Sequence, residues 1–156
     1  MRGKRALKKD IKNDRKYSRV DISKFINYIM EDGKKQLAEN IVYGSFDIIK
    51  SKLKKNPLDI FDSAIKNVSP QIEVRSKRIG GGNYQVPMEV ASGRRQSLAF
   101  RWILKAANSK SGSDMKTRLA NEIIMAAEGQ GDAVRKKEDV YKQAQANRAF
   151  AHFARF

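Results

Sequence analysis

The spacing of hydrophobic residues predicts two helices in the first third of the chain. Ile22, Phe25 and Ile26 begin a series at i, i+3 and i+4, which Ile29 and Met30 continue on the same face. Asp21 is predicted to cap the first helix, and Gly33 is predicted to end it as the C′ residue. A second helix is predicted over residues 34–53, with inward-facing positions at Leu37, Ala38, Ile41, Val42, Ile48 and Ile49.

The sequence Asn56-Pro57 predicts the start of a third helix. Asn suits the N-cap, Pro suits the first turn, and Asp59 is placed to interact with the helix dipole. Apolar residues then recur at helical spacing, and Pro70 marks the end. These are Leu58, Phe61, Ile65 and Val68.

Around Ile72 the hydrophobic period changes from helical to alternating. Apolar residues alternate with polar ones over 72–75 and again over 84–90, and four residues, Gly80 to Asn83, join the two runs. This pattern is typical of a β-hairpin. Pro87 lacks a backbone donor, so its strand is expected at an edge. A two-stranded hairpin is only marginally stable alone, so we expect it to lean on helices or on a partner.

Helical periodicity returns after Ser92 and continues to the end of the chain. One helix presents Ala99, Trp102, Ile103 and Ala106 on one face and carries basic residues on another. A loop over 108–113 leads to a helix predicted over 114–128, and a last helix is predicted over 133–149. The fold class predicted is therefore mainly α, with about six helices and a protruding two-stranded β-hairpin at about 71–90.

The strong positive charge of the chain indicates that this helical domain binds a polyanionic partner. The chain has 33 Lys and Arg residues against 17 Asp and Glu, a net charge of +16. Residues 1–19 alone hold nine cations and two acids. We interpret 1–19 as a flexible basic arm that orders on a polyanion, followed by one domain over 20–156. Nucleic acid is the first candidate partner and an anionic membrane surface the second. The plainer alternative for the arm is a solvated terminus.

Several kinds of chemistry are not predicted. With no Cys, the chain has no thiol nucleophile or cysteine-bound zinc, and its one histidine, His152, has no catalytic partner pattern. The glycines at 80–82 lack the lysine and helix of a phosphate-binding loop. We therefore expect no catalytic activity, metal or cofactor. No apolar run suits a secretory signal or approaches the ~20 residues of a membrane span.

Four stretches together resemble one known family. They are KFINYIMEDGKKQLAENIVY at 24–43, VSPQIEVRSKRIGGGNYQVPMEV at 68–90, RRQSLAFRWILKAA at 94–107 and AQANRAFAHF at 144–153. They are similar to the universal small-subunit ribosomal protein number seven, in its bacterial or organellar form. The resemblance covers the chain from about residue 17. Departures occur at KNDRKY, where the family often carries prolines, and at the AFAHFARF ending.

The resemblance implies a structural role in translation. It implies binding to a junction in the 3′ major domain of small-subunit rRNA, early assembly of the head, and a position near exit-site tRNA and mRNA. Ribosomal proteins nine and eleven are implied neighbours, in a cytoplasmic or an organellar ribosome. The implied rRNA contacts are Arg2, Lys4, Arg5, Lys8, Lys9, Lys24, Lys34, Lys35, Arg75, Lys77, Arg78, Arg94, Arg95 and Arg101. Implied contacts with the tRNA exit site or neighbouring proteins are Gly80, Gly81, Gly82, Asn83, Tyr84, Arg148 and His152.

Two other classes of protein remain alternatives at this stage. Basic helices with a β-arm are also typical of architectural DNA-binding proteins, but the predicted hairpin tip has no apolar residue to wedge between base pairs. An RNA-modifying enzyme is the other class, and no cofactor loop or acid–base pair supports it. Whether the protein binds its own messenger RNA is left open by the sequence.

Overall fold

The computed structural model describes residue 3 and residues 10–155. Two compact units make up the chain, Met1–Asn40 and Ile41–Phe156, and each is considered by itself below. Helix α2, Lys35–Leu53, contains the boundary between them. The predicted division into an arm over 1–19 and one domain over 20–156 stays a prediction.

The first unit contains a turn followed by helix α1, Val20–Ile29. Asp14 is 6% exposed, and its carboxylate accepts hydrogen bonds from the backbone N–H groups of Lys16 at 3.1 Å and Tyr17 at 2.9 Å. Part of the predicted arm therefore forms a defined turn stabilised by an aspartate side chain.

Both predicted ends of the first helix are wrong by a few residues. The N-cap is Arg19, and Asp21 lies inside the first turn, where its charge interacts favourably with the helix dipole and pairs with the Arg19 guanidinium. The helix ends earlier than predicted, with Met30 as its C-cap. Gly33 instead occupies the following turn with φ of 72°, a conformation that glycine adopts without strain.

Helix α2 confirms the predicted second helix to within one residue, but its buried face differs from the predicted one. Leu37 is 56% exposed, because successive helical residues are about 100° apart and its neighbour Ala38 takes the buried position. Within the second unit, the fully buried residues of α2 are Val42, Ser45, Phe46 and Ile49. Phe46 was not included in the predicted face.

Helices α3, Pro57–Val68, α4, Ser92–Ser109, and α5, Met115–Ala127, form the core of the second unit with α2. Phe61 of α3 lies at its centre, with ring centroids 5.5 Å from Phe46 and 6.2 Å from Phe100. The predicted cap of α3 is confirmed, since the Asn56 side chain accepts a hydrogen bond from the N–H of Leu58 and Pro57 opens the helix.

A buried carboxylate connects α5 to the next helix, α6, Asp132–Ala146. Glu122 of α5 is fully buried. One of its oxygens accepts a hydrogen bond from Lys110 Nζ at 2.5 Å, and the other accepts the N–H of Ala133 at 3.0 Å in the first turn of α6. The carboxylate thus satisfies a backbone donor that the helix itself leaves unpaired.

The predicted hairpin is present and consists of β1, Ile72–Ile79, and β2, Gly82–Glu89. Ile72 pairs with Glu89 at one end and Ile79 with Gly82 at the other. The turn is therefore two residues, Gly80 and Gly81, with φ of 55° and 88°, as a tight hairpin turn of this length requires. Gly82 and Asn83, predicted in the turn, belong to β2 instead.

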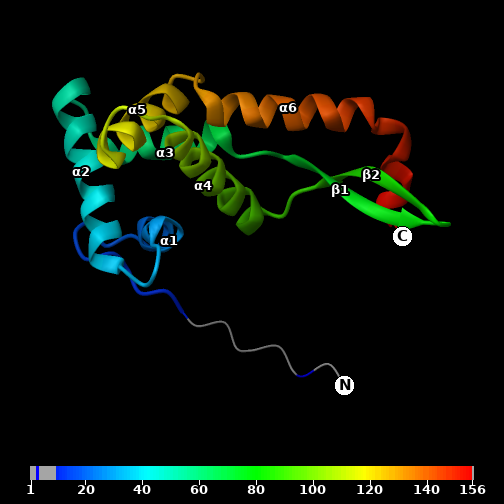
Figure 1. Ribbon diagram of the computed structural model, residues 1–156, viewed down its shortest axis with the longest axis horizontal. Coiled ribbons are helices and arrows are strands. Elements are labelled where there is room, and N and C mark those ends of the chain that lie inside the picture. The colour runs from blue at the N-terminus through cyan, green and yellow to red at the C-terminus, as the bar shows by residue number, and fades with distance from the viewer. Residues whose placement is uncertain (1–2, 4–9, 156) are drawn as a thin grey trace. The chain divides into compact units, whose positions relative to one another are not determined.

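Figure 1 shows the hairpin projecting away from α3, α4 and α5, with α6 running alongside it. The predicted last helix is too long: α6 ends at Ala146, and the chain continues as the 3-10 helix η1, Arg148–Arg155. Asn147 caps α6, and its side chain donates to the Gln143 carbonyl at 2.9 Å. The change of direction brings η1 against β2, so the hairpin leans on helices from the same chain.

Candidate nucleic-acid interface

The base of the hairpin is joined to the start of α4 by a carboxylate that binds two arginines. Glu73 of β1 is 7% exposed. Its oxygens accept hydrogen bonds from Arg75 Nε at 2.5 Å and from Arg94 Nε at 2.8 Å. The two arginine side chains remain 47% and 42% exposed. We call this group the Glu73 clamp; it fixes two predicted rRNA-binding cations at one angle to each other.

The electrostatics of the Glu73 clamp favour a charged carboxylate. Burial alone would raise the pKa of Glu73, but the hydrogen bonds and charges of Arg94 and Arg75 outweigh it, so this pKa lies below its ordinary value of 4.5. One negative charge among two arginines leaves a net positive, half-exposed surface. Glu73 is not among the predicted site residues, because nothing local to a strand position signals a partner 21 residues away.

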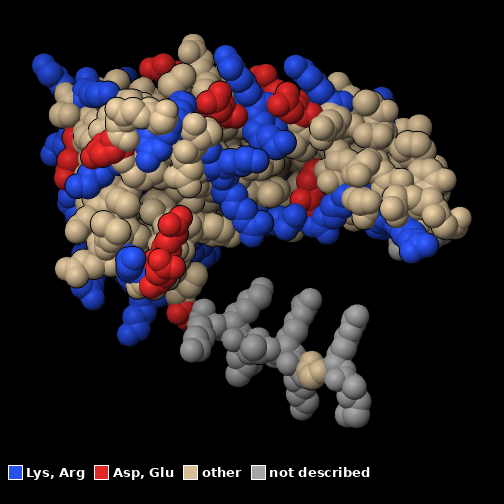
Figure 2. Space-filling view, in the orientation of Figure 1, with Lys and Arg blue, Asp and Glu red and all other residues tan. Residues whose placement is uncertain are grey.

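Helix α4 continues the basic surface beyond the Glu73 clamp. Arg95 is half-buried, and its Nε donates to the Val90 carbonyl at 2.7 Å, so part of its role is to hold the end of the hairpin. Arg101 and Lys105, one helical turn apart, are exposed. Figure 2 shows Lys and Arg side chains gathering over α4 and the base of the hairpin. The structure thus brings Arg75 and Arg94 together through Glu73, with Arg95 next to Arg94 and Arg101 seven residues further along α4.

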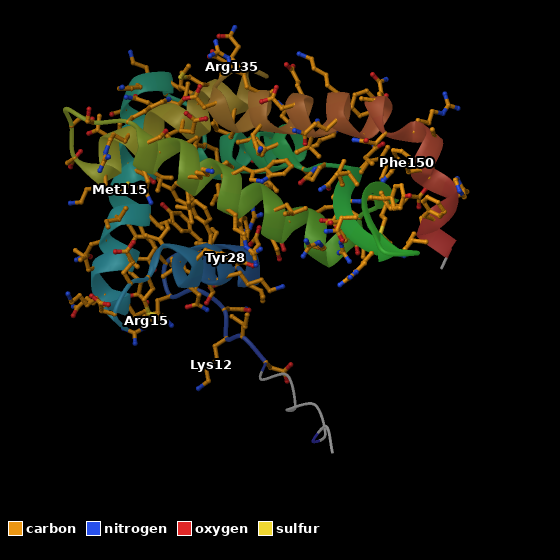
Figure 3. The ribbon with its side chains drawn as sticks, turned by 45° about the vertical axis from the view of Figure 1, so that its right-hand side comes forward. Lys12, Arg15, Tyr28, Met115, Arg135 and Phe150 are labelled. Carbon is orange, nitrogen blue, oxygen red and sulfur yellow. The ribbon has the colours of Figure 1, made fainter. Side chains whose placement is uncertain are left out.

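The far end of the hairpin is packed against the C-terminal segment. Tyr84 lies 5.3 Å from both Phe150 and Phe153, measured between ring centroids, and Lys77 Nζ donates to the Phe153 carbonyl at 3.2 Å. Phe150 appears in Figure 3 between η1 and the strands. Of the two cations predicted here, Lys77 therefore has an internal partner, whereas Arg78 is exposed.

Both predicted contacts in η1 are exposed. His152 lies with its ring centroid 4.0 Å from that of Phe153, and its Nδ1 is 2.9 Å from the Ala149 carbonyl. Arg148 opens the segment and is also exposed. They lie on η1, which contacts β2, the strand that holds Gly82, Asn83 and Tyr84, and Gly80 and Gly81 form the turn before that strand. Sequence reasoning missed Phe150 and Phe153 as supports, although the AFAHF spacing places two aromatics three residues apart.

The remaining predicted contacts lie in the first unit or outside the described residues. Lys24 is half-exposed on α1, Lys34 is exposed in the turn before α2, and Lys35 is exposed as the first residue of α2. Lys34 forms a surface pair with Asp32, 3.6 Å apart, which is of little energetic consequence. Five predicted arm contacts, Arg2, Lys4, Arg5, Lys8 and Lys9, lie outside the described residues.

Neither a metal site nor a membrane span emerges from the described residues. Over residue 3 and residues 10–155, no three His, Asp or Glu side chains gather in a way that could hold a metal ion. No helix in that part of the chain combines the length and the apolar character needed to cross a membrane.

A helical body with a hairpin held against its own helices, and with arginines gathered at the hairpin base, is typical of basic proteins that bind nucleic acid. The sequence profile of the family described as ribosomal protein S7p/S5e matches residues 1–148. A relative from Thermotoga neapolitana, named small ribosomal subunit protein uS7, is 53% identical over 153 residues, covering 98% of this chain and 99% of its own.

Two further relatives carry the same name. The protein from Polynucleobacter necessarius is 50% identical, covering 97% of both chains, and that from Afipia carboxidovorans is 52% identical, covering 95% of both. This chain belongs to the ribosomal protein S7p/S5e family. It is a structural ribosomal protein and not an enzyme, which confirms both the resemblance and the expectation of no catalysis.

Proposed function

We propose that this protein is a structural component of the small ribosomal subunit that binds a multi-helix junction in the 3′ major domain of the rRNA. In this role it nucleates assembly of the head. The Glu73 clamp carries the proposal, because it ties cations of the hairpin and of α4 into one surface of fixed geometry. A folded RNA junction is recognised through its phosphates and shape, and such recognition requires cations at fixed relative positions.

Arginine suits this task better than lysine. Its planar guanidinium can grip a phosphate with two hydrogen bonds, and it is less strongly hydrated than an ammonium group. In the Glu73 clamp the carboxylate binds one edge of each guanidinium, and the two arginine side chains stay 47% and 42% exposed on the surface that would meet RNA. Binding would then stabilise the one junction geometry that matches the surface.

The hairpin and η1 would lie near exit-site tRNA and mRNA, with ribosomal proteins nine and eleven as neighbours. The aromatic contacts of Tyr84 support this placement, because they hold a glycine tip and Arg78 away from the helical body in a defined direction. The ribosome would be cytoplasmic or organellar. The relatives' name, small ribosomal subunit protein uS7, supports the choice of subunit.

The proposal predicts a steep salt dependence of rRNA binding. Neutralising 6–10 phosphates lowers affinity by about 10³–10⁵ between 50 and 200 mM salt. Deleting residues 1–16 would make this slope shallower, and Arg78→Gln would reduce it by about one phosphate contact. The matched control is Lys50→Gln, an exposed cation on α2 outside the predicted contacts. A slope unchanged by the deletion would remove the arm from the interface.

A further inference from the structure

A groove runs between α6 and the hairpin, on residues that none of the proposed contacts uses except Arg148. Its wider part has a volume of about 670 Å³ and is lined by Lys66, Lys137, Glu138, Lys142 and the segment Ser69–Ile72. Its narrower part, about 300 Å³, is lined by Pro87, Met88, Glu89, Ala144, Arg148 and Ala151. Ile72, Tyr141 and Gln145 line both parts, so the two lie side by side. We call this feature the α6 groove.

The two parts of the α6 groove differ in chemistry. The wider part carries three lysines and one glutamate, whereas the narrower part is mostly apolar and has one cation and one acid. Lys137 donates to the Asn67 carbonyl at 2.7 Å and so anchors α6 to the end of α3. Lys66 and Lys142 are exposed and form no ion pair with any described residue. Two cations are thus available to an anion beside an apolar channel.

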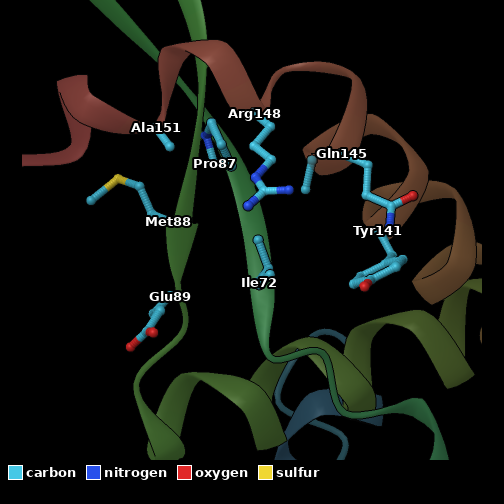
Figure 4. Close-up of a pocket in the computed structure, with 9 residues that line it drawn as sticks. Ile72, Pro87, Met88, Glu89, Tyr141, Gln145, Arg148 and Ala151 are labelled. Carbon is cyan, nitrogen blue, oxygen red and sulfur yellow. The ribbon is translucent and has the colours of Figure 1, made fainter.

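An exposed aromatic ring stands where the two parts meet. Tyr141 is 53% exposed, so its ring is open to a ligand in the groove. Figure 4 shows its ring and the guanidinium of Arg148 on the α6 side of the groove, facing Ile72 and Pro87 of the strands. A flat ligand could stack on the Tyr141 ring and place an attached anionic group near Lys142.

We propose that the α6 groove binds a single-stranded RNA segment. Aromatic stacking beside cations that follow the backbone is the general chemistry of single-strand binding, and it tolerates any base sequence. Charge complementarity selects this occupant over a polypeptide, because the chain carries a net charge of +16 and the wider part of the groove is basic. The adjacency of the two parts favours a strand over a lone nucleotide, since successive nucleotides of a strand can occupy both.

The proposal rests on the proposed function only in that a ribosome supplies RNA to the site. The Glu73 clamp and the cations of α4 belong to the proposed junction surface, whereas Tyr141, Lys66 and Lys142 belong to the groove. Loss of groove binding and loss of junction binding are therefore separate results. The first is measured with a short oligonucleotide and the second with a folded rRNA fragment.

The test measures binding of the full chain to a short, labelled, mixed-sequence oligoribonucleotide by fluorescence anisotropy. Stacking on an aromatic side chain contributes enough that Tyr141→Ala should weaken binding about 5- to 150-fold, whereas Tyr141→Phe, which keeps the ring, should bind like the unaltered protein. Lys142→Gln should weaken binding and lower its salt slope. Lys136→Gln is the matched control, because this exposed cation lies on the same helix outside the groove.

Three outcomes would overturn the proposal. Tyr141→Ala could bind the oligonucleotide as well as the unaltered protein does, or Lys136→Gln could weaken binding as much as Lys142→Gln. Adenosine monophosphate or an acidic peptide could displace the oligonucleotide at lower concentration than unlabelled oligonucleotide, which would assign the groove to a free nucleotide or to a polypeptide. Protection of residues 137–148 from hydrogen exchange by the oligonucleotide, lost in Tyr141→Ala, would confirm the site.

Discussion

Replacing Glu73 with Gln should lower the stability of the hairpin base without removing any of its cations. The carboxylate is almost fully buried and accepts hydrogen bonds from two guanidinium groups. Hydrogen bonds to charged groups each contribute about 1.5–3 kcal/mol. The two arginine side chains are nearly half-exposed, so water can solvate them once the carboxylate charge is removed. This solvation offsets part of the lost hydrogen-bond energy. We therefore expect Glu73→Gln to lower the free energy of unfolding by about 2–3 kcal/mol.

Thermal unfolding followed by circular dichroism measures this loss. For a chain of this size, 2–3 kcal/mol corresponds to a fall in Tm of about 4–12 °C. Glu89→Gln is the matched control, because Glu89 is an exposed glutamate on the paired strand, and its replacement should change stability by less than about 0.5 kcal/mol. Equal losses in the two variants would refute the role assigned to the clamp.

The pH dependence of stability, compared between the unaltered protein and Glu73→Gln, gives a second check. The folded-state pKa of Glu73 is depressed, so its contribution is complete above the unfolded-state pKa, near 4.5, and is lost as pH falls through the folded value. The difference between the unaltered protein and Glu73→Gln should be constant near neutral pH and should shrink below pH 4.5. For RNA, the variant should lose selectivity for the native junction without losing salt dependence, because no cation is removed.

Three further changes test how the site is supported. Phe153→Ala removes a ring that contacts both Tyr84 and Phe150, so the hydrogen-exchange rates of the amides at the hairpin tip should rise about tenfold. The rates in α3 should not change, and an equal rise in both places would contradict local support of the hairpin by this ring. Glu122→Gln should lower the free energy of unfolding, measured with denaturant, by about 3–5 kcal/mol, because it breaks the buried link to Lys110 and α6. The exposed Glu128→Gln should change it by almost nothing, and similar losses in the two variants would refute this link. Gly81→Ala should lower the free energy of unfolding by about 1–2 kcal/mol, because φ at this position is 88°. Gly93→Ala, in the first turn of α4 with open space around it, should be neutral or stabilising, and a neutral Gly81→Ala would argue against the tight turn.

Local signals in the sequence were sufficient for most elements of the fold. Asn56-Pro57 predicted the start of α3 because capping and the proline ring act within one turn. The alternation around Gly80 and Gly81 predicted the hairpin, although the register that assigns Gly82 to β2 depends on pairing across strands. Leu37 was assigned to the wrong face because a short apolar run fits two adjacent helical stripes, and only tertiary packing chooses between them.

The cations of the candidate site could be predicted from the sequence, but the residues that hold them in place could not. Arg75 and Arg94 were expected at the RNA surface, but Glu73, which fixes both, is separated from Arg94 by the whole hairpin. The same holds for Tyr84 and Phe153, which are brought together only because α6 ends at Ala146. Charge and periodicity are local properties of a sequence, whereas a clamp or an aromatic cluster depends on which distant segments the fold brings together.

Competition binding tests the central claim most directly. The purified full chain is bound to a labelled small-subunit rRNA 3′-domain fragment in 0.2 M salt, and unlabelled native fragment, scrambled RNA or duplex DNA is added. The account predicts that only the native fragment displaces the label at low concentration, since junction geometry and not charge alone is recognised. Equal displacement by all three competitors would contradict the account, because it would mean that the positive charge of this protein binds any nucleic acid.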